Sequence, residues 1–87
     1  GSSFAAQMAA EDVLAKYHIN AKLDHVDIST AASVQPEVII TAQNFQKQFA
    51  NFDIDTSQTA IIYLQNIVSS QEIEEKLIPV LQDRNLI

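Results

Sequence analysis

Two uninterrupted apolar runs constrain this chain more than any other feature of its sequence. Residues 37–42 read EVIITA and residues 59–64 read TAIIYL, and neither run alternates between apolar and polar side chains. A strand with one face in water alternates, whereas a strand covered on both faces does not, and strands of the second kind belong to parallel sheets under helices. The two runs therefore predict an α/β protein built on a parallel sheet.

Helical periodicity surrounds these runs. Apolar side chains spaced three and four residues apart predict helices over residues 3–18, 43–52 and 70–84. Ser69 and Glu72 have the spacing of a capping box at the start of the last helix. Pro79 lies inside that helix and is expected to kink it.

The end of the first predicted helix carries two further signals. Asp12 and Lys16 lie four residues apart with opposite charges, so we expect an ion pair between them on the helix surface. Asn20 is expected to adopt the left-handed conformation that ends many helices.

A third strand is predicted at residues 21–28, AKLDHVDI, where the alternation is imperfect and indicates a sheet edge. Residues 29–35 predict a loop with at most a short helical turn. The order of elements then calls for a fourth, central strand upstream of Gly1, because layered α/β domains open with a strand. The predicted fold is one domain over residues 1–87: a small open parallel sheet with three strands present, helices on both faces, and a flavodoxin-like or Rossmann-like three-layer architecture.

The composition argues against two classes of protein, nucleic-acid binders and membrane-spanning proteins. The 87 residues hold 5 basic and 11 acidic side chains, for a net charge of −6, and the basic residues are scattered. This argues against nucleic acid as a partner, because its binders cluster basic residues. No apolar run approaches the roughly 18 residues of a membrane span, and the start lacks the features of a signal peptide. We therefore expect a cytoplasmic protein that does not insert into the membrane.

The opening residues Gly1, Ser2 and Ser3 form the candidate site. A Gly-Ser lead-in to a helix suits a phosphate, because backbone N–H groups and the positive end of the helix dipole point at the same place. Cloning tags leave the same residues. The helix that follows favours the interpretation as a phosphate-binding loop.

The segments GSSFAAQMAAEDVL, EVIITA and AIIYLQNIVSSQEIEEKLIPVL together resemble the enzyme IIB component of the bacterial sugar phosphotransferase system, in its ascorbate/galactitol-like group. The resemblance covers essentially the whole chain. Family members have a first strand, a Cys-Gly-x-Gly-x-Gly-Ser-Ser loop, and then this helix. Gly1, Ser2 and Ser3 match the last three positions of that loop. This sequence contains no cysteine, so the resemblance implies a phosphorylated cysteine upstream of Gly1.

The resemblance implies a phosphoryl carrier. In the family, a phosphohistidine on the IIA partner passes its phosphoryl group to the IIB cysteine, which passes it to a sugar or polyol imported by the membrane component IIC. No cofactor and no metal are implied. An alternative remains open, because domains similar to IIB also act as regulatory interaction modules of transcription regulators. Ascorbate, galactitol and other polyols or pentoses all remain open as the sugar.

Other polar side chains follow the predicted strands. Ligands of open α/β sheets bind outside the carboxyl ends of the strands. The candidate rim residues on this basis are Ser29, Thr30, Thr41, Gln43 and Asn66.

Three groups of residues are given structural interpretations. His18 and His25 are expected to be a helix-end and a sheet-edge residue rather than phosphoryl carriers. The aspartates lack the spacing of a calcium loop, so no metal site is predicted. Phe45, Phe49 and Phe52 are expected to pack on the sheet rather than to form a partner-binding patch.

Overall fold

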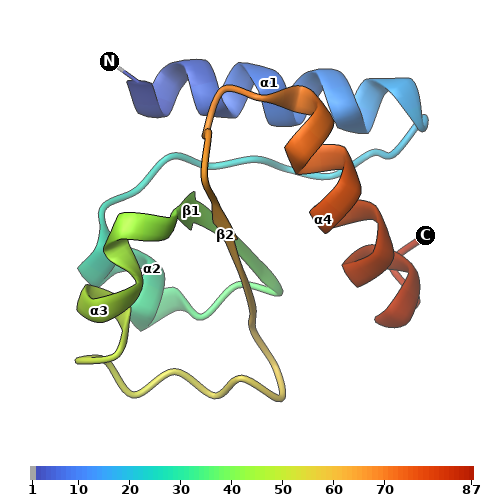
Figure 1. Cartoon of the computed structure of the whole chain (residues 1–87). Coiled ribbons are helices and arrows are strands. Elements are labelled where there is room, and N and C mark those ends of the chain that lie inside the picture. The colour runs from blue at the N-terminus through green and yellow to red at the C-terminus, as the bar shows by residue number, and fades with distance from the viewer. Residues whose placement is uncertain (1) are drawn as a thin grey trace. The chain divides into compact units, whose positions relative to one another are not determined.

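The computed structural model describes residues 2–87, with side chains from Phe4 onward (Figure 1). The chain divides into two compact units. The helical unit runs to His25 and resumes over Asn66–Ile87, and the sheet unit comprises Val26–Gln65. That the two fold as one domain over residues 1–87 stays a prediction. The elements in chain order are α1 (Ser2–Lys16), α2 (Ile28–Val34), β1 (Val38–Ala42), the 3-10 turn η1 (Gln43–Phe45), α3 (Gln46–Phe49), β2 (Ala60–Leu64) and α4 (Ser70–Asp83).

The sheet unit is built on β1 and β2, which pair in parallel as a two-stranded sheet. Their register runs from Val38 opposite Ala60 to Ala42 opposite Leu64. The two uninterrupted apolar runs are therefore confirmed as parallel strands, each within a residue of its predicted start, and the chain is a mixed helix–strand protein. The three-stranded sheet and the Rossmann-like layering are not confirmed.

The strand predicted over residues 21–28 is wrong. Residues 19–27 form no helix or strand, and α2 begins at Ile28. The physical reason is the lack of a partner, because a strand is stabilised by backbone pairing with a neighbour and by side-chain contacts across it. Within residues 21–27 all side chains but the half-buried Leu23 are exposed.

Residues 29–35, predicted as a loop with at most a short helical turn, belong largely to the seven-residue helix α2. Asp27 caps α2, because its Oδ1 accepts a hydrogen bond from the backbone N–H of Thr30 at 2.8 Å. Gln35 ends α2 in the left-handed region, with φ of 49°, and its N–H donates to the carbonyl of Ala31. Two well-formed ends thus stabilise a helix too short to be recognised by its periodicity.

One apolar cluster forms the core of the sheet unit. Ala31 of α2, Ile39 of β1 and Phe49 of α3 are buried in it, and Phe45 packs against it. Phe49 meets the ring of Tyr63 edge-on, with centroids 6.3 Å apart. The expected packing on the sheet is confirmed for Phe45 and Phe49, whereas Phe52 is exposed. The helix predicted over residues 43–52 is broken into η1 and the short α3.

Thr59 is an exception in the apolar interior. Thr59 is fully buried, and its Oγ1 has no hydrogen-bond partner among the described residues. Its backbone N–H donates to the carbonyl of Asp55 at 2.9 Å. The hydroxyl has therefore lost its hydration without compensation, which destabilises the fold.

The helical unit consists of α1 packed against α4. Both helices bury one apolar stripe; its members are Ala9, Ala10, Val13 and Leu14 on α1, and Ile73, Leu77, Ile78 and Leu81 on α4. Within residues 2–87, no helix has both the length and the apolar character needed to cross a membrane.

Both helices of this unit end in the same way. The N–H of Ile19 donates to the carbonyl of Leu14 at 2.9 Å, and the N–H of Leu86 donates to that of Leu81 at 2.8 Å. His18 and Asn85 precede these donors with φ of 56° and 59°. This is the Schellman arrangement, in which the left-handed residue lets the chain turn back onto the last helical carbonyls. His18, rather than the predicted Asn20, takes the left-handed conformation after α1.

The start of α4 also follows its sequence signal. The N–H of Glu72 donates to Ser69 Oγ at 3.1 Å, as a capping box requires. The Glu72 carboxylate accepts instead from the backbone N–H of Asn66 at 2.9 Å. The helix continues past Pro79 to Asp83.

Candidate functional site

The predicted phosphate-binding residues lie at the start of α1. Gly1 lies outside the described residues. Ser2 and Ser3 are the first two residues of α1, a helix of 15 residues with no acidic residue in its first turn, so they belong to the helix and not, as predicted, to a loop before it. The first N–H groups of any helix have no partner inside it and carry the positive end of its dipole. This helix end therefore offers hydrogen-bond donors to an anion without a carboxylate beside them.

Ser29 and Thr30 come together at the start of α2, around Asp27. Ser29 Oγ donates to Asp27 Oδ1 at 3.0 Å, and the same oxygen accepts from the Thr30 N–H. These hydrogen bonds, led by the one from the Thr30 backbone, hold the pKa of Asp27 below its usual range. In this structure the Ser29 hydroxyl and the Thr30 N–H stabilise the helix start.

The remaining rim residues are in two separate places. Thr41 lies near the carboxyl end of β1, half-buried, and the exposed Gln43 begins η1 directly after that strand. Asn66 belongs to the helical unit, where its Oδ1 accepts from the N–H of Val68 at 3.1 Å and its carbonyl accepts from the N–H of Ser69 at 3.1 Å. Asn66 therefore acts as a turn residue that leads into α4.

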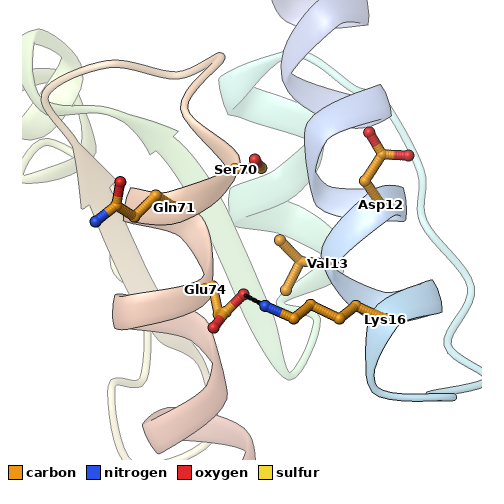
Figure 2. A pocket seen from close by; sticks show the side chains of 6 residues that line it. All are labelled: Asp12, Val13, Lys16, Ser70, Gln71 and Glu74. Carbon is orange, nitrogen blue, oxygen red and sulfur yellow. Dashed lines mark hydrogen bonds and ion pairs between the residues drawn. The ribbon is translucent and has the colours of Figure 1, made fainter.

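A cleft lies between α1 and α4 in the helical unit (Figure 2). Its volume is about 330 Å³, and its lining residues are Asp12, Val13, Lys16, Ser70, Gln71 and Glu74. The side chains around it are mixed in chemistry: two carboxylates, one ammonium, one hydroxyl, one amide and one isopropyl group. The cleft was not anticipated from the sequence, because its residues come from helices more than 50 positions apart.

An ion pair spans this cleft (Figure 2). Lys16 Nζ donates to Glu74 Oε1 at 2.9 Å, and the Tyr17 hydroxyl donates to Glu74 Oε2 at 2.9 Å. Lys16 is thus paired with a carboxylate of α4 and not, as predicted, with Asp12. The predicted pair would have linked two positions of one helix, whereas the observed one links α1 to α4.

The same contacts shift three pKa values. The hydrogen bonds from Lys16 and then from Tyr17 lower the pKa of Glu74, and the hydrogen bond to Glu74 raises the pKa of Lys16 and of Tyr17. The cleft therefore keeps its charged pair ionised across the neutral range. We assign this pair a structural role, because it links α1 to α4.

The stability of the protein should fall in acid partly because of Glu74. Since the folded pKa is lowered, its contribution is fully present above the ordinary carboxyl pKa and is lost as the pH falls through the folded value. We expect Glu74→Gln to be less stable at neutral pH and to lose less stability than the wild type on acidification. Urea unfolding at a series of pH values measures this. Glu75→Gln, one position along α4, is the control, and an unchanged acid profile in Glu74→Gln would contradict the expectation.

No protein-family model matches this sequence, and neither a curated protein nor a solved structure is detectably similar to it.

Proposed function

We propose that this chain is the scaffold of a phosphoryl carrier of the enzyme IIB type. One observation carries the proposal. Ser2 and Ser3 open α1, a helix of 15 residues with no acidic residue in its first turn. A phosphoryl group next to this end would meet backbone N–H donors and a favourable dipole. The parallel pairing of β1 with β2 supports the α/β scaffold that the proposal requires, and the three-layer arrangement belongs to the same proposal.

The chemistry divides into two transfers. In the first, the N–P bond of a phosphohistidine on IIA breaks as an S–P bond forms to a cysteine thiolate. In the second, the S–P bond breaks as an O–P bond forms to the sugar, whose hydroxyl proton is released. The cysteine would belong to residues outside this sequence, which contains none. The residues of this chain would bind and orient the phosphoryl oxygens, which is the main catalytic work in transfers of this kind.

The test uses the natural protein that contains this sequence. It is incubated with phosphoenolpyruvate, the general phosphotransferase components and a IIA protein, and its intact mass is measured over time. We expect the gain of one phosphoryl group. The Ser2→Ala, Ser3→Ala double variant should slow this gain about 10- to 100-fold, because each hydroxyl would donate to a charged phosphoryl oxygen.

Ser29→Ala is the matched control. The Ser29 hydroxyl donates a hydrogen bond to Asp27 within the sheet unit. Because it does not belong to the start of α1, the rate of phosphoryl gain should stay close to that of the wild type. A protein that gains no phosphoryl group is not a carrier. A protein that gains it but passes none to a sugar in the presence of IIC fits the regulatory module instead.

A further inference from the structure

We draw no further inference here: the strongest candidate, the surface patch made by the exposed apolar side chains of Phe4 and Met8 on α1, adjoins the helix start already described, and nothing within residues 2–87 shows what covers it.

Discussion

Replacing Phe49 by alanine is expected to lower the free energy of unfolding by about 3–5 kcal/mol. Phe49 is 4% exposed and lies between α2 and the sheet, with its ring edge-on to Tyr63. The substitution removes the largest of the three buried side chains of the cluster and leaves a cavity that two short helices and two strands have little means to fill. Since a domain of this length is stable by roughly 5–10 kcal/mol, the variant should be close to unfolding.

Phe52→Ala is the matched control. Phe52 lies three residues further along and is 38% exposed, so its replacement should change the stability by about 0.5 kcal/mol or less. Urea denaturation followed by circular dichroism measures both variants. Equal losses of stability would mean that the cluster around Phe49 is not the core of the sheet unit.

Ile73→Ala should destabilise the protein by about 2–5 kcal/mol through the helical unit. Ile73 is 0% exposed, in the first half of α4, whereas Ile87 at the end of the chain is 48% exposed. Ile87→Ala removes the same atoms and should change the stability by about 0.5 kcal/mol or less. The difference between these two variants in denaturant unfolding isolates the effect of burial. A comparable loss in both would contradict the packing of α4.

The two core variants together also test whether residues 1–87 form one domain. If the helical and sheet units unfold together, each substitution lowers the midpoint of one shared transition. If they unfold separately, amide exchange in Phe49→Ala accelerates only in the sheet unit, and exchange in Ile73→Ala only in the helical unit. The first result is the one that the single-domain prediction requires.

The elements that could be predicted are those whose signal is contained in a short segment. The two strands follow from apolar runs that no amphipathic surface element would have. The start of α4 follows from Ser69 and Glu72, whose capping bond needs only one turn of helix. In each case the residues that carry the signal also make the stabilising contacts.

The predictions that failed depend on distant partners. Residues 21–28 have a strand-like pattern, but a strand also needs a neighbour to pair with. Asp12 is the near partner of Lys16 on one helix, yet Lys16 pairs with Glu74, 58 positions away. No spacing rule reaches that far. The α2 helix was missed for the opposite reason, because seven residues are too few for a periodicity to emerge.

For the candidate site, the helix start could be predicted from the sequence, but the roles of the polar residues after the strands could not. The start of α1 at Ser2 follows from the helical pattern of the residues after it. Ser29, Thr30 and Asn66 were selected because polar residues follow strands in ligand sites, and the same residue types also favour helix caps and turns. In the structure these residues make the hydrogen bonds of helix caps and turns. Sequence position alone does not separate the two uses.

The two units differ in how their residues are distributed along the sequence, and this affects when each unit can fold during translation. The sheet unit is continuous in sequence, so all of its residues are available once Gln65 has been made. The helical unit is interrupted, because α1 is synthesised before the sheet unit and α4 after it. During translation the apolar stripe of α1 therefore stays without its packing partner α4 until the whole sheet unit has been made. Of the two helices of this unit, α1 is the one that most needs protection from aggregation during synthesis.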